Sequence, residues 1–342
     1  MELTQDKLRI CLRVAFASAA GLLITKVMNL NFGVFFTVYP MLLLGMIPVL
    51  NRFIALQFIG SSLLTSLEIM ILPSLLHNWP PAFTVVVFLL FLGRFLLMAR
   101  GPMLLFGASG CVSLSIMLHF SSYEHFSLTD MAMMNILASV LSVAMAYIAY
   151  AFLPNKEPLV PRVMPVKSDN VIRHQALLGA IVATLSFTVF QTLDLVDSLS
   201  AQVATVLVLF PMSFMGAVES GRQRCIGCLL GCALGLSTQL FLYSHYHNLV
   251  LLSLSFWLCA MVFARWHVKE GVSGIGFAGL TTTGILFGQY IGADQDLVYS
   301  AFYRMSSMTI AILVTLCCVY LVHKILNLFP ATRYEILPSG QP

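Results

Sequence analysis

Long apolar runs alternate with short polar breaks along almost the whole chain. Each run is about 20 residues long, and a helix of that length spans a hydrocarbon core of about 30 Å. About twelve runs are present, near residues 9–28, 31–50, 53–76, 82–99, 101–120, 131–153, 176–195, 199–218, 223–243, 248–265, 271–292 and 298–326. The pattern predicts an all-α, polytopic integral membrane protein with about 12 transmembrane helices.

Composition points to the same class of protein. Hydrophobic residues make up 59% of the chain and charged residues only 9%, whereas soluble domains carry about 25% charged residues. The formal net charge of +4 comes from the polar breaks and favours contact with anionic lipid headgroups. We therefore expect a lipid bilayer as surroundings and no nucleic acid as partner.

A short motif occurs twice, half the chain length apart. Residues 39–45 read Tyr-Pro-Met-Leu-Leu-Leu-Gly, and residues 210–216 read Phe-Pro-Met-Ser-Phe-Met-Gly. Proline is costly inside a helix, so its recurrence is informative. The motif predicts two six-helix repeats, residues 1–153 and 175–342, joined by a proline-bearing cytoplasmic linker at 154–174. An even number of helices per repeat gives both halves the same orientation, related by a twofold axis along the membrane normal.

Basic residues predict the orientation. Sixteen of the 18 Lys and Arg residues fall at one side of the predicted spans, which the positive-inside rule makes the cytoplasm: Lys7, Arg9, Arg13, Arg52, Arg94, Arg100, Lys156, Arg162, Lys167, Arg173, Arg222, Arg224, Arg265, Lys269, Lys324 and Arg333. The opposite loops carry acids: Glu124, Asp130, Asp194, Asp197, Asp294 and Asp296. Both termini are predicted to be cytoplasmic.

Three charged residues fall within apolar runs near the outer side. Glu68 lies about 22 Å from the cytoplasmic edge, and Arg304 lies about 9 Å below the outer edge, at similar depth. A buried carboxylate needs a partner or a proton. Glu68 therefore predicts either a proton-coupling residue or an ion pair with Arg304, with a snorkelling side chain as third reading. Arg304 and Lys26 either attract a carboxylate substrate or snorkel, and Gln239 occupies the position matching Glu68.

Two further segments are candidates for substrate contact or movement. The glycine-rich eleventh run has Thr281, Thr282 and Thr283 at its centre, which predicts either tight packing or an interrupted helix that binds substrate. In the repeated motif, Pro40 and Gly45 with Pro211 and Gly216 are hinge candidates, or they only shape the bundle. Tyr39 and Phe210 beside these prolines are candidates for stacking on an aromatic ligand.

Charged and sulfur-containing clusters have simpler interpretations. Arg52 in the first half, and Glu219, Arg222 and Arg224 in the second, form a predicted cytoplasmic charge cluster, explained by orientation or by a gating ion pair. Cys225, Cys228 and Cys232 share a helix face with Gly227, Gly231 and Gly235, which favours helix packing over a metal site. No catalytic constellation or cofactor motif is present, so we expect no metal and no cofactor.

The repeated motif and residues 221–227, Gly-Arg-Gln-Arg-Cys-Ile-Gly, resemble the fusaric acid resistance (FUSC) and aromatic acid exporter superfamily. The matching positions are Pro40, Gly45, Pro211, Gly216, Arg222 and Gly227. The resemblance implies a bacterial inner-membrane exporter of aromatic carboxylic acids, often working with a HlyD-type periplasmic adaptor. Many members have a large cytoplasmic domain, whereas this chain resembles a compact, membrane-only branch.

The first functional hypothesis is thus an inner-membrane efflux permease that is driven by the proton gradient and exports small organic acids, aromatic ones first, or toxic compounds. A homo-oligomer is left open. One rival is a membrane scaffold that does not transport, which predicts no cavity between the halves. The other is a membrane-embedded enzyme acting on lipids. Its only support is a group of predicted outer histidines, His77, His245 and His247.

Overall fold

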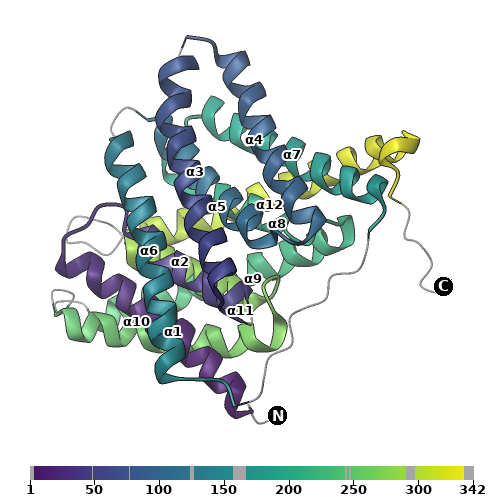
Figure 1. The fold of residues 1–342 in the computed structure, drawn as a ribbon. Helices are drawn as coiled ribbons and strands as arrows, with labels where there is room; N and C mark the ends of the chain where they lie inside the picture. Colours follow the sequence, from purple (N-terminus) through teal and green to yellow (C-terminus); the bar gives the residue numbers. More distant parts are fainter. Residues whose placement is uncertain are drawn as a thin grey trace.

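The computed structural model describes residues 4–47, 49–76, 78–123, 127–156, 167–242, 245, 248–289 and 297–334. Within these residues the secondary structure is entirely helical, which confirms the predicted fold class (Figure 1). Nine of the described helices are long and apolar enough to cross a membrane. The chain is therefore a multi-pass membrane protein.

Each predicted span corresponds to one helix. In chain order they are α1 (Gln5–Val27), α2 (Gly33–Met46), α3 (Arg52–Leu76), α4 (Pro80–Arg100), α5 (Leu104–Ser121), α6 (Leu128–Phe152), α7 (Asp169–Thr192), α8 (Leu199–Val208), α9 (Phe214–Leu242), α10 (Leu249–Glu270), α11 (Ile275–Gln289) and α12 (Leu297–Asn327). Two short 3₁₀ helices, η1 (Val196–Ser198) and η3 (Pro330–Thr332), precede α8 and follow α12.

The boundary between α8 and α9 differs from the prediction. The sequence pattern predicts one span over 199–218, but α8 ends at Val208 and α9 begins at Phe214. Pro211 lacks the N–H that a continuing helix needs, and Met212 has a left-handed φ of 54°. The Ser213 hydroxyl then accepts the Gly216 N–H at 3.2 Å and opens α9. Apolar composition continues across the turn, so hydropathy alone does not reveal it.

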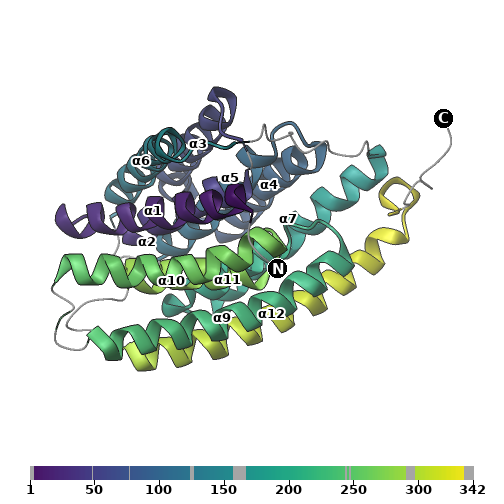
Figure 2. The ribbon, with the colours of Figure 1, turned by 90° about the horizontal axis from the view of Figure 1, so that it is seen from below.

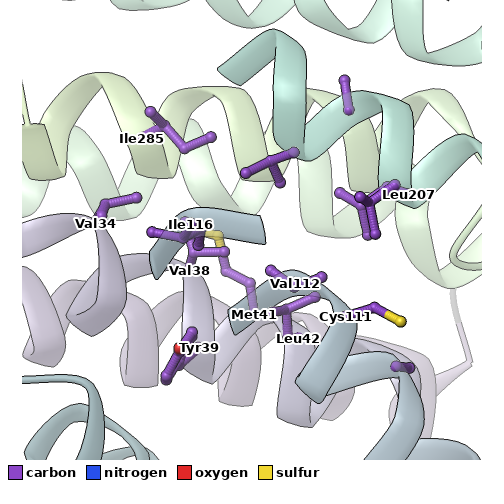
Figure 3. Packing of buried hydrophobic residues seen from close by; sticks show 14 of the residues in the cluster. Val34, Val38, Tyr39, Met41, Leu42, Cys111, Val112, Ile116, Leu207 and Ile285 are labelled. Atoms are coloured by element: carbon purple, nitrogen blue, oxygen red, sulfur yellow. The ribbon is translucent and has the colours of Figure 1, made fainter. Parts of the chain in front are cut away.

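Four helices form the centre of the bundle. The helices α2, α5, α8 and α11 are nearly or completely buried, and α8 is buried along its whole length. Figure 3 shows Val38 and Met41 of α2 beside Val112 and Ile116 of α5 in this core. The longer helices around them expose large apolar side chains such as those of Leu56, Phe241 and Val250, as lipid-facing helices do.

Contacts between the first and last six helices come in matching pairs. Helix α1 packs against α10 and α4 against α7, while α2 packs against α11 and α5 against α8. Figure 2 shows α1, α10 and α9 lying side by side along the bundle, with α12 next to α9. Two of these four contacts thus bring central helices together, and two join outer ones.

Candidate functional site

A polar pocket of about 500 Å³ lies at the N-terminal end of α2. It is lined by the end of α1, the following turn, the start of α6 and one residue of α11; the polar or charged lining residues are Thr25, Lys26, Asn29, Asn31, Ser127 and Asp130. Lys26 is half-buried there. If Lys26 attracts a carboxylate substrate, it has a pocket in which to do so, and it shares that pocket with the carboxylate of Asp130.

A second pocket, of about 290 Å³, lies at the C-terminal end of α2. Its polar side chains are Arg13 of α1, Tyr150 of α6 and His267 of α10. The remaining lining is Ile10, Leu44, Gly45, Met46, Ile47, Val268 and Gly271. Helix α1 packs against α2, and each pocket contains one basic side chain of α1. These two residues, Arg13 and Lys26, are 13 residues apart, which is about 20 Å along a helix.

Arg13 is almost completely buried, with 1% of its surface exposed. One guanidinium nitrogen, Nη2, donates to Asn155 Oδ1 at 2.6 Å, and the guanidinium carbon lies 3.9 Å from the centre of the Tyr150 ring. Nη1 has no hydrogen-bond partner among the residues that the structure describes. The guanidinium is therefore held on one side by an amide and an aromatic ring, and one of its nitrogens is unused.

His267 lies between the ends of two helices. Its Nε2 is 2.9 Å from the carbonyl oxygen of Gly45, in the last turn of α2, and its Nδ1 is 3.1 Å from that of Gly271, which ends α10. A neutral imidazole has one N–H, so only the imidazolium donates to both carbonyls. Carbonyls at helix C-termini also favour a cation. This position can hold a proton.

The two pockets are separated by the buried middle of α2. Tyr39 donates its hydroxyl to Asn135 Oδ1, which also accepts from Ser113 at 3.0 Å. Asn135 Nδ2 donates to the Ser62 carbonyl at 3.0 Å and to the Ser66 hydroxyl at 2.9 Å. Tyr39 is thus a member of a satisfied polar network in the core and is not in either of these pockets.

The partner of Glu68 is Arg94 of α4, and the predicted pair with Arg304 is wrong. Arg94 Nη2 also contacts the Thr65 hydroxyl at 3.2 Å. Arg304 is buried on α12, close enough to Cys228 and Cys232 to act electrostatically on their thiols. The sequence placed Glu68 and Arg304 at a similar depth, but similar depth did not make them partners. Arg94, which the sequence assigned to the cytoplasmic side, reaches inward to Glu68 instead.

The threonines of α11 are used within the protein. Thr281 bonds the carbonyl of Phe277 at 3.0 Å, and Thr283 bonds that of Gly279 at 2.9 Å, both within their own helix. Thr282 is buried beside Cys228. Helix α11 runs without interruption through this segment. A methyl group on Gly227 of α9 would lie 2.5 Å from Ala278, so the glycines here permit close packing.

Apart from Gly45, the other predicted hinge and stacking residues lie outside these two pockets. Pro40 is inside α2, whereas Pro211 is in the turn after α8, so the two prolines do not form matching helix kinks. Phe210 is in the same turn and half-buried, and Gln239 is half-buried on α9. Gly45 belongs to the second pocket, and Gly216 to the first turn of α9.

The predicted charge cluster is divided. Glu219 and Arg222 form an exposed ion pair at 2.9 Å, and Arg52 is exposed at the start of α3. Arg224 is buried, 6.0 Å from the centre of the Phe277 ring, and is no part of the cluster. It points inward because residues 222 and 224 lie on different faces of one continuous helix.

Some predicted positions lie outside the described residues: Glu124, Asp294, Asp296, Arg162, His77 and His247. Among the described ones, no group of three or more His, Cys, Asp or Glu is arranged for a metal ion. The Cys228 and Cys232 sulfur atoms are 4.0 Å apart on one face of α9.

Sequence reasoning missed Arg13 and His267 as site residues. Arg13 was counted among the orienting cations, although it lies eight residues beyond the start of α1, about 12 Å into the helix. A cation at that depth, with its nearest acid, Asp6, seven residues earlier in the first turn of the helix, is the signal that would have identified it. His267 gave no comparable signal, since its contact with Gly45 joins residues from opposite halves of the chain.

Comparisons with known families cover both halves of the chain. Residues 184–318 match the family described as "Fusaric acid resistance protein-like", and residues 10–149 match "Protein of unknown function (DUF2955)". No curated protein and no solved structure matches the chain. The first match agrees with the resemblance deduced from the sequence and supports movement of small compounds across a membrane.

Proposed function

Since this chain is a polytopic membrane protein with the fusaric acid resistance-like pattern in its second half, we propose that it is an efflux permease for small organic anions, aromatic acids among them. The proposed setting is the bacterial inner membrane, with both termini in the cytoplasm. A HlyD-type periplasmic adaptor is the proposed partner, and the permease is not an enzyme.

The observation that carries the proposal is the arrangement of two pockets at the ends of α2. Each has a basic side chain from α1, Lys26 at one end and Arg13 at the other. In alternating access the route for the substrate is open to one side of the membrane at a time. A basic side chain at each end of a closed segment would attract an anion from either side. In the proposed orientation, the Arg13 pocket faces the cytoplasm and the Lys26 pocket faces outward.

Both pockets include residues from the two halves of the chain. Gly288 of α11 contributes to the Lys26 pocket, and His267 of α10 contributes to the Arg13 pocket. The rival scaffold hypothesis predicts no cavity between the halves. Pockets shared by α1, α2 and helices of the second half therefore favour a permease.

The matching contacts between the halves support a mechanism for alternating access. If each of the first six helices corresponds to the one six places later, the contact of α1 with α10 corresponds to that of α7 with α4. In the same way, α2 with α11 corresponds to α8 with α5. We infer two repeats, 1–153 and 175–342, related by a twofold axis. Rocking of one repeat against the other would open the α2 pockets in turn.

Proton exchange is the proposed energy source. Glu68 in its ion pair with Arg94 and His267 between its two carbonyls are the two proton-binding candidates. The Glu68 pair has a structural alternative, since it joins α3 to α4. His267 lines a pocket, which makes exchange with solvent easier to explain.

The test is uptake of radiolabelled benzoate and hexanoate into inverted membrane vesicles, with and without an uncoupler. We expect uncoupler-sensitive uptake in the wild type that is reduced in Glu68→Gln or in His267→Gln. If neither benzoate nor hexanoate is taken up by vesicles that contain folded protein together with the adaptor, the permease proposal is rejected. Uptake that persists with the uncoupler would reject proton exchange as the energy source but would leave the permease proposal standing.

A further inference from the structure

The geometry points to the Arg13 pocket as a binding site for the anionic group of a small amphipathic molecule, with the Arg13 guanidinium as the donor to that group. This inference deepens the proposed function by giving the ligand chemistry of one pocket, and it rests on that proposal for its biological role. A carboxylate of a small organic acid and the phosphate of a lipid headgroup present the same chemistry, and the experiment below separates them.

The charge balance at Arg13 is the first argument. The side chain is 1% exposed, and no Asp or Glu of the described residues lies within ion-pair distance of it. The nearest acid on its own helix, Asp6, is 4.0 Å from Arg9 and accepts the Lys156 N–H at 2.9 Å. A buried charge without an opposite charge is costly. An anion in the adjoining pocket would offset that cost.

The unused nitrogen is the second argument. Asn155 and the Tyr150 ring fix the guanidinium, so its orientation does not depend on a ligand. Nη1 is left without a partner although it lies inside the protein. Buried polar groups are nearly always hydrogen-bonded, and each exception needs an explanation. A charge-assisted bond from Nη1 to an oxyanion would supply the missing partner.

His267, when it is protonated, adds charge without adding a donor. When both of its N–H groups are given to Gly45 and Gly271, none remains for a ligand, so its effect on an anion is electrostatic. The acid acting on this ring is Glu270, whose carboxylate accepts the Gly276 N–H at 3.0 Å. The residues of α2 and α11 that contact the His267 ring are Gly45 and Phe277, and neither carries a charge.

The rest of the lining suits a small apolar body. The side chains of Leu44, Met46 and Ile47 line one part of the pocket, and Ile10 lines another. The volume of about 290 Å³ is at the low end of ligand pockets, which run from about 300 to 1,000 Å³. The site therefore fits one small acid, or one headgroup, with its charged group at Arg13.

Binding is measured on the purified full chain in nanodiscs of zwitterionic lipid, by titration calorimetry with benzoate and with its neutral analogue benzyl alcohol. The wild type is expected to bind benzoate. Arg13→Gln should bind it at least about tenfold more weakly, because one charge-assisted bond is lost. Arg13→Lys should fall between them. Lys7→Gln, which removes an exposed cation of the same helix that lines neither pocket, is the matched control and should bind as the wild type does.

Two outcomes overturn the assignment. One is wild-type affinity in an Arg13→Gln protein whose melting temperature shows that it is folded. The other needs no variant: equal affinity of the wild type for benzoate and benzyl alcohol. Nanodiscs containing phosphatidylglycerol identify the source of the anion. Unchanged benzoate affinity assigns the site to soluble acids, whereas competition that Arg13→Gln removes assigns it to a lipid headgroup. Benzoate binding without uptake in vesicles would reject the permease while retaining the site.

Discussion

Glu68 of α3 and Arg94 of α4 form an ion pair inside the bundle, with side chains that are 15% and 5% exposed. The same guanidinium contacts Thr65 at 3.2 Å and the Leu90 carbonyl at 3.3 Å. The pair therefore connects two neighbouring helices at a depth where an isolated charge is costly. Whether or not Glu68 also carries protons, its removal leaves Arg94 without an opposite charge.

Glu68→Gln is expected to lower the stability of the folded protein by about 3 kcal/mol, since breaking a buried pair strands the remaining charge. Thermal unfolding of the detergent-solubilised protein, followed by tryptophan fluorescence, measures the effect. Glu219→Gln is the matched control, because Glu219 pairs with Arg222 on an exposed surface and should have no measurable effect. A Glu68→Gln protein as stable as the control would contradict a structural role for the pair.

Asn135→Ala should destabilise the protein by on the order of 3 kcal/mol. All four hydrogen-bonding positions of the Asn135 amide are used, so truncation leaves several buried groups unpaired, Tyr39 among them. Ser139→Ala, four residues along α6, is the control. Ser139 is fully buried but bonds only the Ile136 carbonyl of its own helix, at 2.7 Å. Equal melting temperatures for the two variants would show that the network adds little.

The sequence was sufficient to predict the class of fold and nearly every helix. Lipid requires backbone hydrogen bonds to be satisfied within each span, so apolar length alone identifies helices. Apolar length failed as a guide between α8 and α9, where residues 209–212 are apolar and yet lie outside any helix. Backbone conformation decided that boundary, through Pro211 and the left-handed Met212. Hydropathy carries no information on such a choice.

The site was less predictable because it depends on contacts between distant parts of the chain. Lys26 was named as a substrate-binding candidate and lines a pocket, whereas Arg13 was assigned to orientation and His267 was not considered. Glu68 was recognised as a buried acid and given the wrong partner. Depth along a helix can be estimated from residue number, whereas the direction in which a side chain faces depends on helix rotation and tilt.

Gly227→Ala is expected to destabilise the contact between α9 and α11. The new methyl group would lie 2.5 Å from the Ala278 side chain and 2.7 Å from the Ile275 carbonyl oxygen, so the helices must separate. Gly93→Ala in α4 is the control, because nothing lies within 4 Å of its added methyl group. There the change should be neutral or stabilising by about 0.5–1 kcal/mol, from helix propensity. Thermal unfolding of both variants tests the difference, and a similar loss in each would contradict close packing at Gly227.

His323→Phe should loosen the segment that follows α12. The Thr332 carbonyl can only accept, so His174 Nδ1 donates to it at 2.7 Å, and His174 Nε2 accepts from His323 Nδ1 at 2.9 Å. His323 Nε2 then accepts from Asn327 at 3.1 Å. Phenylalanine keeps the ring stacked on Phe214, 5.7 Å away, but breaks both bonds of His323.

Because the chain of bonds runs from Asn327 through both imidazoles to Thr332, its interruption should raise the amide hydrogen exchange of residues 331–334 several-fold. Exchange in α3, far from this cluster, should stay unchanged. Lys324→Gln supplies the control, since Lys324 is exposed beside His323 and contacts only the Tyr320 ring, at 5.7 Å. Unaltered protection of residues 331–334 in His323→Phe would mean that ring packing and the other hydrogen bonds of the segment hold it without the paired imidazoles. One of these bonds joins Asn170 of α7 to the Pro330 carbonyl at 3.2 Å.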